Sequence, residues 1–232
     1  NDILDLSKIE AGKLDLQIEE VNLRELSSQV VEILNYHALK KNLNLRANLS
    51  PSLPKLVFGD LLRLRQILFN LLSNAIKFTE EGIVELKIEV LETQIDKQLQ
   101  KFRFSVIDTG IGIALENQQK IFEAFTQENP TAVKKYGGTG LGLTISNRLL
   151  ALMGSKLALE SKQGEGSTFY FDLILKPNLF EADNNTRQPY EEGGHSGRRH
   201  PKPSSSTEGS ILIAEDNAAN MLLMKSYFNN II

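Results

Sequence analysis

Cysteine is absent from the 232 residues, so disulfides and thiolate metal sites are excluded, while a reducing compartment is allowed without being required. No apolar run approaches the length of a transmembrane helix, and no signal peptide is visible. The net charge of −3 argues against a nucleic-acid or anionic-membrane binder but leaves small anions open. The apolar fraction is ordinary for a globular protein, so we expect a hydrophobic core.

Composition divides the chain into parts. Residues 14–176 alternate between helical and strand patterns and form the expected main domain. Residues 177–210 hold mostly Gly, Ser, Pro, Asn and charged residues, which predicts a flexible linker. Residues 211–232 start with an apolar run and a helical pattern, too short to bury a core. Because residues 1–13 begin inside a periodic segment and the end is abrupt, we expect a fragment of a longer protein.

Apolar spacing predicts the secondary structure of the main domain. Asn22 opens a capping box, Asp60 could cap the central helix, and glycines at 12 and 154 are suited to end helices. His37 falls in the middle of a helix, where we expect a partly buried structural residue. The predicted helices are about 22–41, 61–78, 116–122 and 141–153, and the predicted strands are about 14–18, 43–49, 84–90, 102–106, 156–161 and 168–175.

The stretch Asn70–Lys77 stands out within the predicted helix 61–78. Its leucines, isoleucine and alanine repeat at helical spacing and would face a core. Asn70 and Asn74 are one turn apart on one face, and Lys77 follows on the same side. Two amide oxygens and an ammonium group suit a hydrated magnesium ion and a phosphate chain. Asparagines on a helix can equally be solvated surface residues.

Three glycine-rich stretches follow. In the first, Asp108–Gly112, an acceptor-only carboxylate after a strand matches the amino group of adenine, although a turn with a solvated aspartate fits too. The second, Gly137–Leu143, leads into a helix whose N-terminal N–H groups would favour phosphate, or it is a flexible loop with an ordinary cap. The third, Gly164–Thr168, could be a plain hairpin turn. Neither a Rossmann fingerprint nor a P-loop is present.

In this order, the motifs N-x-x-x-N, D-x-G-x-G, F-E-x-F, G-T-G-L-G-L and G-x-G-S-T-F resemble those of the ATP-binding catalytic domain of sensor histidine kinases, a member of the Bergerat-fold group. The resemblance covers roughly residues 14–175. It implies an α+β fold, a two-layer α/β sandwich with helices on one face of a mixed sheet. It also implies ATP and Mg²⁺ as cofactors.

Carried over by residue, the resemblance implies catalytic roles for Asn70, Asn74 and Lys77. Asn74 would bind magnesium with support from Asn70, and Lys77 would contact phosphate. Asp108 would read the adenine amino group. The other implied nucleotide contacts are Phe78 near the base, Gly110 and Gly112 in the adenine pocket, Gly138, Thr139, Gly140, Leu141 and Gly142 along the phosphates, and Thr168 at the base end. Residues 126–140 would form a lid, with Phe125 at its base and Phe122 there or in the ordinary core.

The flanks resemble parts of a hybrid histidine kinase. Residues 1–13 are similar to the end of the dimerisation and phosphoacceptor hairpin, which implies a homodimer in the full-length protein. Residues 211–232 are similar to the first strand and helix of a truncated α/β receiver domain, in which Glu215 and Asp216 would hold Mg²⁺ near an aspartate beyond residue 232. The receiver in cis and a downstream response regulator are the implied partners, with no nucleic acid. The resemblance implies a cytoplasmic location, with the parent anchored in the inner membrane.

One position separates kinase from hydrolase. The gyrase-type, mismatch-repair and heat-shock relatives resemble one another in carrying a Glu four residues before the magnesium asparagine, where it activates water. Here that residue is Asn70, and an amide cannot take the proton, so we expect phosphoryl transfer to a histidine. His37, His195 and His200 lack the acidic neighbour of the phosphoacceptor box, and Gln127 stands where many relatives have a basic residue. A catalytically silent ATP-binding module and a Bergerat-fold ATPase are the alternatives.

Overall fold

The computed structural model describes residues 7–9, 11–91, 99–122 and 140–178. The chain divides into two compact units, 1–187 and 188–232, and all of these residues belong to the first. The predicted linker beyond residue 178, the receiver segment with Glu215 and Asp216, and the lid up to residue 139, with Gly138 and Thr139, lie outside the described residues.

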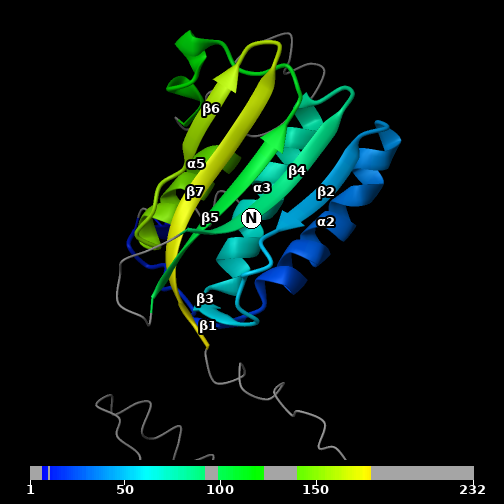
Figure 1. Ribbon diagram of the computed structural model, residues 1–232. Coiled ribbons are helices and arrows are strands. Elements are labelled where there is room, and N and C mark those ends of the chain that lie inside the picture. Colours follow the sequence, from blue (N-terminus) through cyan, green and yellow to red (C-terminus); the bar gives the residue numbers. More distant parts are fainter. Residues whose placement is uncertain (1–6, 10, 92–98, 123–139, 179–232) are drawn as a thin grey trace, which may run out of the picture. The chain divides into compact units, whose positions relative to one another are not determined.

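A layer of strands and a layer of helices make up the described domain (Figure 1). The sheet order is β1-β3-β7-β5-β4-β2, with β6 paired to β7. Only the β2–β4 pairing is parallel among the described pairs, so the sheet is mixed. The strands are β1 (Glu19–Val21), β2 (Asn44–Leu49), β3 (Val57–Gly59), β4 (Ile83–Leu91), β5 (Gln100–Asp108), β6 (Ala158–Lys162) and β7 (Gly166–Pro177).

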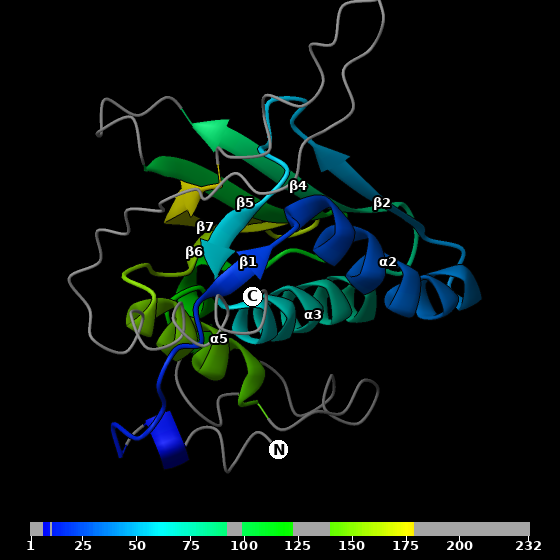
Figure 2. The same cartoon turned by 90° about the horizontal axis from the view of Figure 1, so that it is seen from below.

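Three helices cover one face of this sheet (Figure 2). They are α2 (Leu23–Lys40), α3 (Leu61–Phe78) and α5 (Gly142–Leu152). The predicted two-layer α+β sandwich is therefore confirmed. Among the described residues, no helix is both long enough and apolar enough to cross a membrane.

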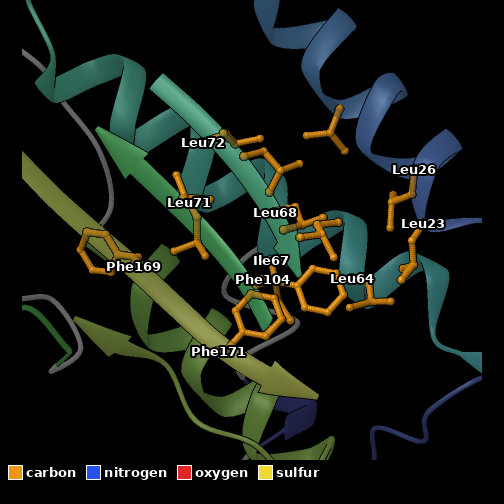
Figure 3. Packing of buried hydrophobic residues seen from close by; sticks show 14 of the residues in the cluster. Leu23, Leu26, Leu64, Ile67, Leu68, Leu71, Leu72, Phe104, Phe169 and Phe171 are labelled. Carbon is orange, nitrogen blue, oxygen red and sulfur yellow. The ribbon is translucent and has the colours of Figure 1, made fainter. Parts of the chain in front are cut away.

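The core forms where α3 meets the sheet (Figure 3). Its apolar residues recur every three or four positions, and Leu64, Ile67 and Leu68 are fully buried. Opposite them, the rings of Phe104 and Phe171 stack with centroids 4.9 Å apart. This burial holds α3 against the strands, so the helix face that carries the two asparagines has a fixed position relative to the end of β5.

Helix caps define where the helices begin. Asp60 accepts a hydrogen bond from the Arg63 N–H at 2.9 Å through Oδ1 and from the Gln17 N–H at 2.9 Å through Oδ2. Asn22 accepts from the backbone N–H groups of Arg24 and Glu25. Both caps were predicted, and the bounds predicted for the central helix, 61–78, are confirmed.

Several predicted elements differ in the structure. The strand predicted at 14–18 is wrong: β1 begins at Glu19, because only three residues pair with β3, and Leu14 packs on the core without a strand partner. The β3 strand was not predicted. The helix predicted at 116–122 is two short 3₁₀ turns, η1 (Leu115–Asn117) and η2 (Lys120–Phe122), with Leu115 largely exposed. His37 is exposed, with its ring nearly perpendicular to that of Tyr36, so the expectation of partial burial is also wrong.

Candidate active site

The predicted site residues that the structure describes come from four places: the second half of α3, the end of β5 with the loop after it, the start of α5, and β7, which holds Thr168. Both α3 and α5 lie beneath the sheet (Figure 2). Gly140 has a left-handed backbone with φ of 71°, and α5 starts two residues later with no acidic residue in its first turn. An anion near this helix end would therefore meet no opposing carboxylate from that turn.

A chain of hydrogen bonds joins α3 to α5. Asn70 Nδ2 donates to Ser146 Oγ at 2.9 Å, and Asn74 Nδ2 donates to Asn70 Oδ1 at 3.4 Å. Because the Asn74 nitrogen is directed at Asn70, its Oδ1 is turned the other way. Within the described residues no donor contacts that oxygen. The structure thus brings together the two asparagines as predicted, with the Asn74 Oδ1 turned away from Asn70.

Gly142, the first residue of α5, allows the close approach of α5 to Asn70. A Cβ built on it would lie 2.1 Å from Asn70 Oδ1, far inside a normal contact. The glycine is therefore required for packing at the asparagine pair, a role that the sequence analysis did not assign to it.

Asp108 ends β5 and is almost fully buried. Its Oδ1 accepts a hydrogen bond from the Gly110 N–H at 2.8 Å. Burial raises the pKa of the Asp108 carboxyl, and hydrogen bonds from the Gly110 and Ser167 backbone partly offset this shift. Within the described ranges no cationic side chain forms an ion pair with Asp108, so its acceptor capacity is not neutralised there.

The loop after Asp108 is packed directly on the end of α3. A Cβ on Gly110 would lie 2.6 Å from the Phe78 carbonyl oxygen, and the Ile111 N–H donates to that same oxygen at 3.3 Å. On its other side, Gly112 has φ of 63°, and a Cβ there would lie 2.0 Å from the Lys162 carbonyl oxygen. Both predicted glycines are thus required by close approach of the backbone.

Lys41 closes the end of α3 from another helix. Its Nζ donates to the carbonyl oxygens of Ile76, Lys77 and Thr79 at 2.8, 2.7 and 3.2 Å. A cation at a helix C-terminus satisfies the last carbonyl groups and complements the helix dipole. The sequence analysis missed Lys41, because its contacts lie more than thirty residues away.

Lys77 and Phe78 share this end of α3. The Lys77 Nζ lies 4.8 Å from the centroid of the Phe78 ring. Burial lowers the pKa of the Lys77 ammonium. Both side chains are half-buried, and they follow Asn74 on α3 at the end where the Phe78 carbonyl contacts the loop after Asp108.

The register of β7 does not support the prediction for Thr168. Ser167 lies opposite Asp108, whereas Thr168 lies opposite Ile107 on the other face of the sheet. Ser167 is buried, and its backbone contacts the Asp108 carboxylate. The sequence contained a signal for Ser167, because it lies two residues before the core residue Phe169 and therefore faces the same side of the strand.

The residues expected at the base of the lid are only partly described. Phe122 packs against the core, and Phe125 and Gln127 lie outside the described residues.

The metal-binding potential lies in amides and not in a carboxylate cluster. Across the described ranges, no group of three or more His, Cys, Asp or Glu side chains could hold a metal ion. Magnesium retains several waters and takes few protein ligands when phosphates supply the rest. The Asn74 Oδ1, which is turned away from Asn70, therefore fits a metal that is shared with a phosphate chain.

Comparisons with known proteins show which family the chain belongs to. Residues 59–177 match the family described as histidine kinase-, DNA gyrase B- and HSP90-like ATPase. Hybrid signal transduction histidine kinase K of Dictyostelium discoideum is 37% identical over 237 aligned residues, which cover 100% of this chain and 19% of that protein. Signal transduction histidine-protein kinase BarA of Escherichia coli K12 is 41% identical over 77% of this chain and 20% of its own length. The chain thus spans about a fifth of these relatives.

Solved structures show the same fold. Full-length ShkA in complex with AMPPNP aligns with a TM-score of 0.66 at 36% identity, covering 77% of this chain and 35% of ShkA. The catalytic domain of histidine kinase ThkA aligns with a TM-score of 0.56 at 29% identity, covering 68% of this chain and 95% of that domain. Together with the family match over residues 59–177, these likenesses mean that the chain belongs to the family of histidine kinase-, DNA gyrase B- and HSP90-like ATPases.

Proposed function

We propose that this chain is the ATP-binding catalytic part of a hybrid sensor histidine kinase. It would transfer the γ-phosphoryl group of ATP to a histidine on an upstream helix, from which the group passes to a receiver aspartate. The observation that carries the proposal is the hydrogen bonding of the Asn70 side chain. Its amide donates to Ser146 and accepts from Asn74, and it has no basic atom with which to activate water.

Asn74 would hold Mg²⁺ through Oδ1, with Asn70 in support. The residues fit the ion because the Asn74 nitrogen is already committed to Asn70, which leaves an oxygen toward the metal. When bound, Mg²⁺ neutralises charge on the phosphates that it shares. Lys77 would add a second cation to the phosphate chain, and its lowered pKa has burial as its cause.

Asp108 would bind the adenine amino group. An ionised carboxylate only accepts hydrogen bonds, and this one is buried with just backbone donors among its described partners. Gly110 and Gly112 would shape the pocket, and Phe78 would pack near the base. We propose Ser167 in place of Thr168 at the base end, because Ser167 lies opposite Asp108.

The phosphates would extend toward the N-terminus of α5, whose N–H groups attract anions. Gly138, Thr139, Gly140, Leu141 and Gly142 are the proposed lining. Of these, Gly140 and Gly142 have the backbone properties that a close approach requires: a left-handed φ in the first and a bare Cα facing Asn70 in the second. At the nucleotide site, positioning and charge neutralisation are sufficient for phosphoryl transfer, and the ATP-binding domain itself would form no covalent bond to the phosphoryl group.

The proposal extends to the rest of the chain. Residues 1–13 would end the dimerisation hairpin, 14–176 would form the catalytic domain, 177–210 a linker, and 211–232 the start of a receiver with Glu215 and Asp216 at its magnesium site. The partners would be the upstream histidine hairpin in a homodimer, the receiver in cis and a downstream response regulator. We propose a cytoplasmic location, with the parent anchored in the inner membrane.

Calorimetric titration of the chain with Mg-ATP, followed by phosphate release over hours, tests this function. We expect binding with negligible hydrolysis, and acid-labile labelling when a separate phosphoacceptor hairpin is added. Binding without labelling of the hairpin would support the catalytically silent module instead. Fast hydrolysis would mean that another base replaces the missing Glu, in favour of an ATPase.

A further inference from the structure

We infer that Ser146 is a positioning residue that holds the Asn70 side chain, and through it the Asn74 amide, in place at the proposed metal site. The inference rests on the proposed Mg-ATP site and adds a residue to it. Ser146 lies on α5, 76 positions along the chain from Asn70, and none of the predicted motif positions includes it.

The geometry starts from a buried hydroxyl. Ser146 is 2% exposed, and its Oγ accepts from Asn70 Nδ2 at 2.9 Å. This contact turns the Asn70 nitrogen toward α5 and its Oδ1 toward the next turn of α3. Asn74 meets that oxygen with its own nitrogen at 3.4 Å. The orientation of one amide therefore determines the orientation of the next.

The contact fixes the place of the Asn70 side chain between the two helices. A serine hydroxyl can accept or donate, so it is a partner for the Asn70 amide in either orientation. Without the hydroxyl, the Asn70 Nδ2 loses the partner on α5 that the structure gives it, and Asn74 then contacts a neighbour that is held less firmly. The position of the Asn74 amide therefore depends on Ser146 through Asn70.

The same contact connects two parts of the site. Ser146 is one turn into the helix whose N-terminus we propose for the phosphates, and Gly142 in that first turn touches Asn70 Oδ1 so closely that no Cβ fits. Ser146 and Gly142 thus hold Asn70 from the same helix. Outer hydrogen bonds to metal ligands commonly contribute ten- to a hundredfold to metal affinity.

The test compares Ser146→Ala with Ser27→Ala in the full chain. Ser27 is a matched control because it is also a buried helical serine, but its Oγ donates to the Leu23 carbonyl on α2, at 2.7 Å. Binding of ADP is measured with Mg²⁺ and with EDTA, and the side-chain amide resonances of Asn70 and Asn74 are recorded by NMR without metal or nucleotide.

We expect Ser146→Ala to weaken ADP binding in Mg²⁺ about tenfold, at the low end of that range, with less than about a twofold change in EDTA. The Asn70 and Asn74 amide resonances should shift in Ser146→Ala and stay in place in Ser27→Ala. Ser146→Thr keeps the hydroxyl and should restore most of the Mg²⁺-dependent affinity.

Three results would overturn the inference. An equal loss of affinity in Mg²⁺ and EDTA would show that Ser146 supports the fold of the pocket and not the metal ligand. Unchanged amide resonances in Ser146→Ala would show that the hydroxyl does not hold the asparagines in place. A wild-type protein that binds ADP equally in Mg²⁺ and EDTA would instead remove the proposed metal site, and the role of Ser146 with it.

Discussion

Two aspartates on neighbouring strands, Asp108 and Asp172, have opposite surroundings. Asp172, on β7, accepts from Arg103 Nε at 2.7 Å and Nη2 at 2.9 Å, and pairs with the Lys101 ammonium at 2.9 Å. Asp108, at the end of β5 on the helix side, receives backbone hydrogen bonds from Gly110 and Ser167. The Arg103 hydrogen bond lowers the pKa of Asp172, whereas burial raises the pKa of Asp108.

The difference separates polar groups that stabilise the protein from those that we propose bind a ligand. A carboxylate that two cations neutralise contributes to folding and has little capacity left for another partner. A buried carboxylate with only backbone donors is costly to ionise. A hydrogen-bond donor on a ligand would stabilise its ionised form. A similar contrast holds between Asn74, whose Oδ1 is turned away from Asn70, and Asn48, whose Nδ2 contacts Glu85 on the open sheet face.

Replacing Asn74 tests this contrast most strongly. Asn74→Ala removes the proposed metal ligand and should abolish detectable Mg²⁺-dependent ATP binding and transfer, a loss of more than about a hundredfold. Asn48→Ala is the matched control and should bind Mg-ATP like the wild type. Titrations with and without Mg²⁺ measure both, and unchanged transfer by Asn74→Ala would remove the metal-ligand assignment.

The two aspartates give the second comparison. Asp108→Asn introduces an amide whose NH₂ group would oppose the adenine amino group, so ATP binding should weaken about ten- to a hundredfold, as for the loss of one hydrogen bond to a charged group. Asp172→Asn should leave ATP affinity unchanged and lower the free energy of unfolding by about 1 kcal/mol or less, because its partners are partly solvated. Calorimetry and denaturant unfolding measure the two effects. Equal ATP affinities for these variants would contradict the assignment of Asp108.

Lys41 contributes to the site by stabilising the end of α3. Lys41→Met keeps the aliphatic stem and removes three hydrogen bonds to carbonyl oxygens, so the free energy of unfolding should fall by about 2 kcal/mol. Lys40→Met removes an exposed ammonium that lies 4.4 Å from the Tyr36 ring centroid and should change stability little. Thermal and urea unfolding distinguish the pair, and equal stability of the two variants would argue against the capping role.

The pH dependence of stability is the smallest expected effect. For Asp108 the pKa in the folded state lies above the ordinary value of 3.8. The folded state therefore binds more protons than the unfolded state, and the free energy of unfolding falls as pH rises from 3.8 through the folded pKa. For Asp172 the folded pKa lies below 3.8, so its contribution is present above 3.8 and is lost as pH falls through the folded value. Urea unfolding from about pH 3 to 7 measures both effects. Asp108→Asn should remove the loss of stability with rising pH, and Asp172→Asn should remove the loss of stability with falling pH. If both variants kept the pH dependence of the wild-type free energy of unfolding, other titrating groups would be responsible for it.

Local pattern was sufficient for α3 and its polar face. The apolar spacing over 61–78, the Asp60 cap and the one-turn separation of Asn70 and Asn74 are properties of one continuous segment. Long strands such as β4 and β5 were predictable for the same reason. The three-residue strands β1 and β3 were not, because pairing with a partner defines them and their own pattern is too short.

The sequence by itself determined the family motifs, the fold class and which residue types are available to bind magnesium, phosphate and adenine. Tertiary structure alone decided which atoms those residues present. The register between β5 and β7 sets Ser167, not Thr168, opposite Asp108. The packing of α5 on α3 turns the Asn70 nitrogen toward Ser146, and the end of α2 brings Lys41 to the carbonyl groups of α3. These contacts join residues 35 to 76 positions apart, and the direction of a hydrogen bond between such residues depends on how whole elements pack, which no local periodicity contains.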